Sequence, residues 1–288
     1  MIVSASYRTD IPAFYGDWFI RRLDDGGCRA INPWNRQPYA VSLRRDDVDG
    51  FVFWTRNLAP FAGHLPRIAD HAPFYVQYTV TGYPRALERS VVAPERAIAS
   101  IIELTHHYGP RAAVWRYDPI LLTDLTDFDW HRAQFARIAA QLAGSVDEVT
   151  ISFAQMYRKT RRNLDLVARD TGIAWFDPPL AQKRELAAAL SETAAAQGMT
   201  LTVCSQRDIA DARIPSAACI DAARLSAIAG KMITAPVKGN RPECLCYRSR
   251  DIGAYDTCPH GCAYCYAVSD PGQAKAAHGT HDPRADCL

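Results

Sequence analysis

The sequence predicts an α/β fold, a partial TIM-like barrel of about six parallel strands, followed by a cysteine-rich segment. Short apolar runs rich in Val, Ile, Thr and aromatic residues alternate with helical patterns, and this alternation occurs six times. No G-x-G-x-x-G motif follows any of these runs, which weakens the alternative of a dinucleotide-binding sheet.

Six runs have the length and composition of buried strands. Parallel strands need crossover connections, and helical patterns of suitable length lie between several of the runs. The predicted strands are IVSAS (2–6), FVFWT (51–55), FYVQYTV (74–80), AAVWRY (112–117), EVTISF (148–153) and TLTVC (200–204). Helices are predicted at Pro94–Tyr108, Trp130–Leu142, Leu180–Gln197 and Asp221–Gly230.

Three further segments complete the barrel prediction. The segment 24–47 lacks a crossover helix and is expected to form a hairpin of CRAIN and YAVSL. MITAPV (232–237) is expected to form a short strand that brings the chain back to the barrel mouth. We therefore predict a barrel domain at 1–237 and a C-terminal cysteine-rich segment at 238–288, whose tail beyond Tyr266 is frayed.

Composition excludes several classes of protein. A chain of 288 residues with 48% hydrophobic and 22% charged residues can bury a large core. Its net charge of +2 gives no reason to expect a polyanionic partner, although the run YRKTRR (157–162) could contact phosphate. Arg8 and Asp10 interrupt any apolar leader, and no long apolar run follows. These features predict a cytoplasmic protein without a membrane partner.

Charged residues gather where predicted strands end. Arg8, Arg56 and Arg116 lie at or just beyond three strands, and a half-buried guanidinium needs a carboxylate or an anionic ligand. Asp10 and Asp118 follow two of these arginines by two residues. Because loops after barrel strands converge at one mouth, the five residues form either stabilising Arg–Asp pairs or an anion site.

Nine cysteines in a cytoplasmic chain suggest metal binding, because disulfides are rare in that compartment. Cys258, Cys262 and Cys265 form a contiguous C-x3-C-x2-C run within TCPHGCAYCYA (257–267). Three thiolates on one loop can share a metal centre and leave an iron open to a further ligand. Cys28, Cys204 and Cys219 are instead interpreted as small buried residues outside the site.

CPHGCAYC resembles the C-x3-C-x-aromatic-C motif of the radical S-adenosylmethionine (SAM) superfamily, to which spore photoproduct lyase belongs, with Tyr264 in the aromatic position. The resemblance implies that the three cysteines hold a [4Fe-4S] cluster whose unique iron binds SAM. It also implies a partial barrel of six strands and an external reductant such as a flavodoxin or ferredoxin. Tyr264 and Arg8 are the candidate contacts of the cofactor.

The whole chain also resembles a bacterial family of uncharacterised proteins with a C-terminal cysteine cluster. The matching stretches are SYRTDIPAFY, INPWN, FVFWTRN, WRYDPI, CID and DIGAYDTCPHGCAYCYA. This second resemblance implies no reaction.

Two departures from the radical SAM pattern affect the prediction. The cysteine loop follows the predicted strands instead of the first one, so the arrangement would resemble a circular permutation. No Gly-Gly-Glu follows the motif, so Asp10, Asp118 or a backbone carbonyl would have to contact the SAM amino group. Cys246 could supply a fourth thiolate, which would close the cluster and suit it to electron transfer.

The favoured interpretation is an enzyme that generates a radical at the cluster and acts on a small anionic substrate in the barrel. Arg56 and Arg116 would anchor the anion, and Asp10 or Asp118 would orient them or assist proton transfer. One alternative is a closed four-cysteine iron–sulfur protein acting in redox chemistry or in nucleotide or nucleic-acid repair. Another is a zinc-stapled barrel that serves as a binding module.

Overall fold

The computed structural model describes residues 1–288 and contains a seven-stranded sheet in which every pair of neighbouring strands is parallel. The strand order is β10-β8-β6-β5-β4-β1-β11. These strands are β1 (Ile2–Ala5), β4 (Gly50–Thr55), β5 (Phe74–Thr79), β6 (Ala113–Ile120), β8 (Glu148–Phe153), β10 (Thr200–Val203) and β11 (Ser249–Asp251). The six predicted strands and the α/β class are confirmed.

The seventh strand, β11, was missed by the sequence prediction. Its three residues, SRD, are polar, and pairing with β1 defines them as a strand. The strand predicted at 232–237 is wrong, because this segment pairs only through a single bridge between Val237 and Tyr247.

The order of the sheet follows the order of the chain once β11 is placed before β1. Each later strand then lies beside its predecessor, from β1 through β4, β5, β6 and β8 to β10. The last strand of the chain therefore lies at the edge of the sheet, beside β1. β10 and β11 form the two edges of the sheet, and no pairing joins them.

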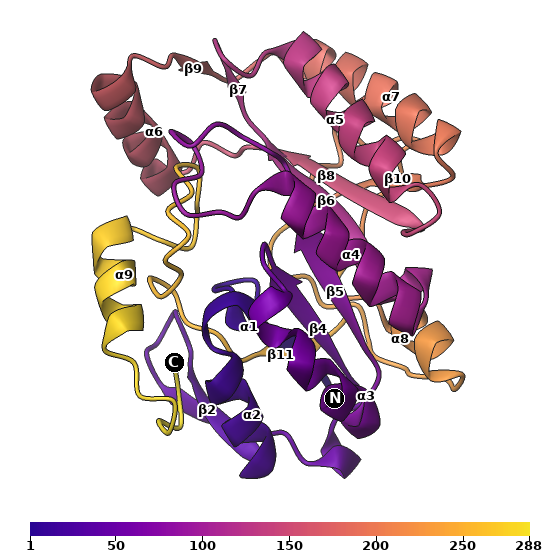
Figure 1. Ribbon diagram of the computed structural model, residues 1–288, viewed down its shortest axis with the longest axis vertical. Coiled ribbons are helices and arrows are strands. Elements are labelled where there is room, and N and C mark those ends of the chain that lie inside the picture. The colour runs from indigo at the N-terminus through magenta and orange to yellow at the C-terminus, as the bar shows by residue number, and fades with distance from the viewer.

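Helices connect the strands, and Figure 1 shows α4, α5 and α7 lying side by side along the sheet. The helices are α1 (Ile11–Phe14), α2 (Gly16–Asp24), α3 (Leu65–His71), α4 (Pro94–Tyr108), α5 (Phe128–Leu142), α6 (Arg158–Thr171), α7 (Leu180–Ala196), α8 (Ala222–Ala229) and α9 (Pro271–Gly279). Short 3-10 helices occur at Arg45–Asp47, Ala59–His64 and Pro110–Ala112. None of the helices is long and apolar enough to cross a membrane.

Two small antiparallel pairs accompany the main sheet. β2 (Gly27–Ile31) and β3 (Pro38–Ser42) form the predicted hairpin, and β7 (Leu122–Thr123) pairs with β9 (Trp175–Phe176).

The two faces of the main sheet differ because successive strand residues point to opposite sides. One face, which includes Val3, Phe51 and Trp115, packs with α4, α5 and α7 in a core of 51 buried residues. On the other face, which we call the inner face, an apolar layer packs with α8; its strand residues are Ile2, Val52, Tyr75 and Val114. Two residues further along the same strands, the inner face carries the buried polar side chains Ser4, Gln77 and Arg116. On this face the strand residues are therefore apolar near the amino ends of the strands and polar toward their carboxyl ends.

The C-terminal tail is ordered, contrary to the prediction of fraying. Residues 271–279 form α9, and Figure 1 shows this yellow helix lying apart from the sheet. Beyond α9 the chain contacts the N-terminal part of the fold, because Trp18 Nε1 donates to Ala285 O at 2.9 Å and Arg29 N donates to Asp286 O at 2.7 Å.

Candidate metal centre

The cysteine loop, residues 252–267, leaves the carboxyl end of β11, and Asp251 fixes its first turn. The buried Asp251 carboxylate accepts hydrogen bonds from Ser4 Oγ at 2.8 Å, Ser6 Oγ at 2.7 Å and Gly253 N at 3.0 Å. Position 253 must be glycine, because a Cβ there would lie 2.1 Å from Ser6 Oγ. Sequence analysis missed Asp251, since it belongs to no cysteine motif or predicted strand end.

Asp10 connects the loop to the strands of the N-terminal half. Its carboxylate caps α1 by accepting from Ala13 N at 2.9 Å, and it also accepts from Arg56 N at 2.8 Å. The same carboxylate lies 2.8 Å from His260 Nε2 in the cysteine loop. Asp10 therefore caps α1 and contacts Arg56 and His260 instead of the neighbouring Arg8.

The backbone of the loop runs against residues 87–90. Ala263 N donates to Leu87 O at 2.9 Å, and Ser90 N donates to His260 O at 2.9 Å. These bonds hold the loop on both sides of Cys262. Cys262 itself forms an isolated antiparallel β-bridge with Glu88. The position of Cys262 is thus set by the backbone of a distant segment.

The three motif cysteines are half-buried on this one loop. Burial raises the pKa of the Cys262 thiol to about 12, with the Arg56 guanidinium acting in the opposite direction. Burial likewise raises the pKa of Cys258 and Cys265. No group of three or more His, Cys, Asp or Glu side chains is arranged to hold a metal ion as the structure stands. The three thiols are therefore not arranged around a common point in this structure.

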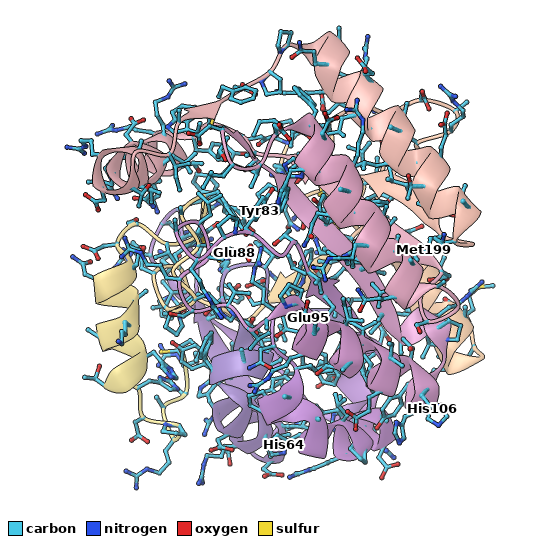
Figure 2. All side chains as sticks on the ribbon, turned by 45° about the horizontal axis from the view of Figure 1, so that its top comes forward. His64, Tyr83, Glu88, Glu95, His106 and Met199 are labelled. Carbon is cyan, nitrogen blue, oxygen red and sulfur yellow. The ribbon has the colours of Figure 1, made fainter.

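Tyr264, the aromatic residue of the motif, joins a buried charged network. Its hydroxyl contacts Glu88 Oε1 and accepts from Arg56 Nη2 at 2.5 Å. Arg56 Nη1 donates to the same Glu88 oxygen at 2.7 Å, as does Thr81 Oγ1 at 2.6 Å. Figure 2 places Glu88 close to Tyr83, whose ring packs edge-on against Tyr264. Sequence analysis missed Glu88 because it lies in a loop outside any motif.

Arg8 has fewer firm partners than the other two arginines. Its guanidinium lies between the rings of Tyr7 and Tyr255, each 5.4 Å from Arg8 Cζ. Its nearest carboxylate, Asp251, is 3.7 Å from Nε, and Nε is buried without a hydrogen-bond partner. Arg8 therefore retains donor capacity beside the first turn of the cysteine loop.

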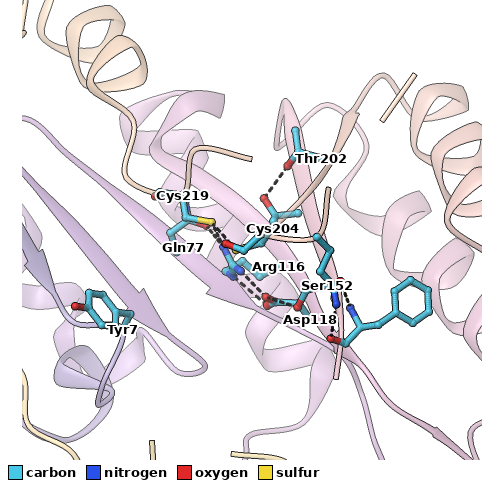
Figure 3. A network of polar contacts seen from close by, with 12 residues as sticks. Tyr7, Gln77, Arg116, Asp118, Ser152, Thr202, Cys204 and Cys219 are labelled. Carbon is cyan, nitrogen blue, oxygen red and sulfur yellow. Dashed lines mark hydrogen bonds and ion pairs between the residues drawn. The ribbon is translucent and has the colours of Figure 1, made fainter. Parts of the chain in front are cut away.

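Arg116 and Asp118 form the Arg–Asp pair that the sequence suggested. Figure 3 shows Arg116 on the inner face, reaching Asp118, Gln77 and Cys219. Its Nε donates to Asp118 Oδ1 at 3.0 Å, its Nη2 bonds to Asp118 Oδ2, and its Nη1 donates to Gln77 at 3.1 Å and Cys219 Sγ at 3.0 Å. Four of the five N–H groups are thus engaged, which leaves one for a ligand.

The predicted residues fall into two places. Arg8, Arg56, Asp10 and Tyr264 contact the cysteine loop or its neighbours, whereas Arg116 contacts Cys219. Cys246, the suggested fourth ligand, interacts with Cys219 and Cys244 and packs in the same apolar cluster as Cys219. Its contacts do not include the three motif cysteines.

The basic run at 157–162 forms the first turn of α6. Lys159 and Arg161 lie over the rings of Tyr255 and Trp175, at 5.8 Å and 5.4 Å. Two of its cations thus pack on aromatic rings of the same chain.

Comparison with known proteins identifies the family. Residues 2–267 match the family described as Domain of unknown function (DUF1848), and the chain belongs to that family. No curated protein matches the chain at a significant level. The family match carries no radical SAM assignment, so that resemblance stays a prediction.

Proposed function

We propose that the chain is a radical-SAM-like iron–sulfur enzyme, in which Cys258, Cys262 and Cys265 hold a [4Fe-4S] cluster. With SAM bound, such a cluster would supply a 5'-deoxyadenosyl radical for hydrogen abstraction from a small anionic substrate. We further propose that the sheet curves as a partial barrel whose mouth lies under the cysteine loop. An external flavodoxin or ferredoxin would reduce the cluster.

One observation carries the proposal: the cysteine loop leaves β11, the strand that occupies the first position of the sheet. The radical SAM pattern has its cysteine loop after the first strand, so the permuted chain keeps that spatial relationship. The donor set also fits, because three thiols on one loop leave a coordination position open.

Arg56 and Glu88 would position the loop and balance its charge. Burial raises the pKa of the Cys262 and Cys265 thiols, and the nearby Arg56 guanidinium opposes this rise, so it would offset part of the cost of forming the thiolates. Glu88 compensates the buried guanidinium and, with Arg56, fixes the Tyr264 hydroxyl. Both residues would therefore act through the loop, and this role for Arg56 replaces the anchoring of an anion that the sequence suggested.

The anionic group of a cofactor or substrate would bind at Arg8. Its Nε lacks a hydrogen-bond partner, and its guanidinium is held between two tyrosine rings beside the loop. Arg116 would contribute its remaining N–H, and Asp118 would keep the Arg116 side chain oriented. Asp10 would hold His260 and so the loop, with no direct part in proton transfer.

The decisive experiment is electron paramagnetic resonance of the anaerobically reconstituted, dithionite-reduced protein with and without SAM. We expect a [4Fe-4S] signal that SAM perturbs, and formation of 5'-deoxyadenosine. Cys262→Ala should abolish both, whereas Cys287→Ser, which changes a cysteine outside the motif, should retain both.

Two other results would favour the alternatives. A signal that SAM leaves unchanged would indicate a closed cluster in a redox or nucleic-acid repair protein, as for other four-cysteine clusters. A colourless protein with zinc bound to the motif cysteines would indicate a zinc-stapled binding module.

A further inference from the structure

Four other cysteines converge on the inner face of the sheet from three separate segments. Cys204 follows β10, Cys219 precedes α8, and Cys244 and Cys246 lie in the ECLC segment before β11. The sulfurs of Cys204 and Cys219 are 3.4 Å apart, and Cys246 Sγ lies 3.4 Å from the backbone nitrogen of Ile220, the residue after Cys219. All four pack in or against one apolar cluster. We call them the inner cysteines.

The backbone around the inner cysteines is held firmly. Cys219 O accepts from Tyr75 Oη at 2.8 Å and from Gln77 Nε2 at 2.7 Å. A glycine at 239 allows the close approach of Cys244, since a Cβ there would lie 2.3 Å from Cys244 O. The convergence of the three segments is therefore built into the fold.

Donors point at the sulfur atoms of the inner cysteines. Arg116 Nη1 donates to Cys219 Sγ at 3.0 Å, and Arg241 Nη2 donates to Cys204 Sγ at 3.4 Å. The backbone N–H of Ile220 donates to Cys246 Sγ at 3.4 Å. Since a neutral thiol is a weak acceptor, two guanidinium groups and an amide suit thiolates better than thiols.

We propose that Cys204, Cys219, Cys244 and Cys246 bind one zinc ion as a closed tetrathiolate site. A tetrahedral ion with Zn–S bonds of about 2.3 Å separates its sulfur ligands by about 3.8 Å. The 3.4 Å between the sulfurs of Cys204 and Cys219 is close to that separation, so the two thiols can bind the same ion. No three of the thiols are arranged around a common point in this structure. Cys244 and Cys246 would therefore have to reach the ion by side-chain rotation.

Two guanidinium groups offset part of the charge of such a site. Four thiolates and Zn²⁺ leave a net charge of about −2. Arg241 and Arg116 donate to the sulfurs of Cys204 and Cys219, and Arg116 also pairs with Asp118. The thiol protons pass to solvent on binding, so the site needs no oxidant or reductant. With no open coordination position, the ion joins β10, the start of α8 and the segment leading to β11. Cys246 is then a ligand here and not of the motif cysteines.

The test measures zinc and iron per chain by mass spectrometry of the full-length protein, produced with both metals and purified anaerobically. We expect one zinc per chain in the wild type. Cys219→Ser and Cys244→Ser should weaken zinc binding by roughly 100-fold while the iron content is retained. Cys262→Ala should have the opposite effect, with loss of iron and retention of zinc. Cys28→Ser, which changes a buried cysteine outside both groups, should retain both metals.

Replacement of zinc by Co²⁺ provides a second readout that needs no variant. The proposal expects strong thiolate-to-cobalt charge-transfer absorption and the visible bands of a tetrahedral ion. A wild-type chain that lacks zinc, that has Cys204 and Cys219 in a disulfide, or that gives no such cobalt spectrum would overturn the proposal. Zinc content unchanged in both serine variants would overturn it as well. None of these results depends on iron at the motif, so the two proposals can fail separately.

Discussion

The motif cysteines and the inner cysteines are built in opposite ways. Cys258, Cys262 and Cys265 lie on one loop, among buried carboxylates and arginines that pair with each other. The inner cysteines come from three segments and lie in an apolar pocket, where the polar groups facing them are donors. The first group depends on local spacing, and the second depends on tertiary packing.

This difference indicates different roles. Three thiols on one loop leave a metal centre incomplete, which suits binding of a further ligand. Four thiols from separate segments complete a tetrahedral shell and cross-link the chain, which suits stability. Arg116 links the polar part of the inner face to the inner cysteines, since it bonds to Asp118 on one side and to Cys219 on the other. The polar inner face and the inner cysteines are therefore neighbours.

The largest expected effect on stability concerns the charges beside the motif cysteines. In Glu88→Ala, the buried Arg56 guanidinium loses its only carboxylate partner. Breaking a buried ion pair in this way costs about 3–5 kcal/mol. Urea denaturation should show this loss of unfolding free energy.

Glu95→Ala is the matched control, because Glu95 pairs with Arg137 at 3.0 Å on the protein surface. Exposed ion pairs contribute less than about 1 kcal/mol. Equal losses of unfolding free energy in Glu88→Ala and Glu95→Ala would contradict the prediction, because the buried ion pair would then stabilise the fold no more than the exposed one.

The sequence allowed much of the fold to be predicted. Long apolar strands such as Phe51–Thr55 and helices such as Pro94–Tyr108 are defined by local patterns, and the structure contains both. Strand β11 could not be predicted, because three polar residues become a strand only through pairing with β1. His131 is fully buried on the side of α5 that faces the core, so a polar residue within a helical pattern does not always mark the exposed side.

Only the part of the candidate site that stands in one short stretch of sequence could be predicted. The motif cysteines and Tyr264 stand in one short run, so spacing alone identifies them. Glu88 is brought to the motif from a distant segment, and no local pattern marks it. His260 stands within the motif, but its partner Asp10 comes from the other end of the chain. Cys204 and Cys219 were interpreted as small buried residues outside the site, and the contact between their sulfurs arises only in the fold.

If both cysteine groups bind metal as proposed, acid should release it, so the effect of pH on the stability of the fold itself must be known for the comparison. His131 contributes to it, because burial lowers its pKa to about 4. The ring is satisfied as a neutral tautomer, with Nδ1 facing Tyr117 Oη at 2.8 Å and Nε2 facing Leu121 O at 3.1 Å. Below its ordinary pKa of about 6.5 the unfolded chain binds a proton that the folded chain does not.

The free energy of unfolding should therefore fall as the pH is lowered from about 6.5, with a loss of about 3 kcal/mol near pH 4. His131→Phe should remove this part of the pH dependence, whereas His106→Gln should not, since His106 is exposed on α4. Denaturation curves at a series of pH values measure the difference. An identical pH dependence in wild type and His131→Phe would contradict the assignment.

The smallest expected effect is that of Gly239→Ala, a variant that distinguishes packing from metal binding at the inner cysteines. Gly239→Ala places a Cβ 2.3 Å from Cys244 O and 2.8 Å from Cys244 Cβ, so the backbone that carries Cys244 must shift. Overpacking of this kind costs about 1–3 kcal/mol. Gly63→Ala is the control, because nothing lies within 4 Å of its added Cβ. If a zinc ion depends on Cys244, the Gly239 variant should lose more thermal stability in zinc-loaded protein than in chelator-treated protein. An equal loss in both preparations would assign the glycine to packing alone.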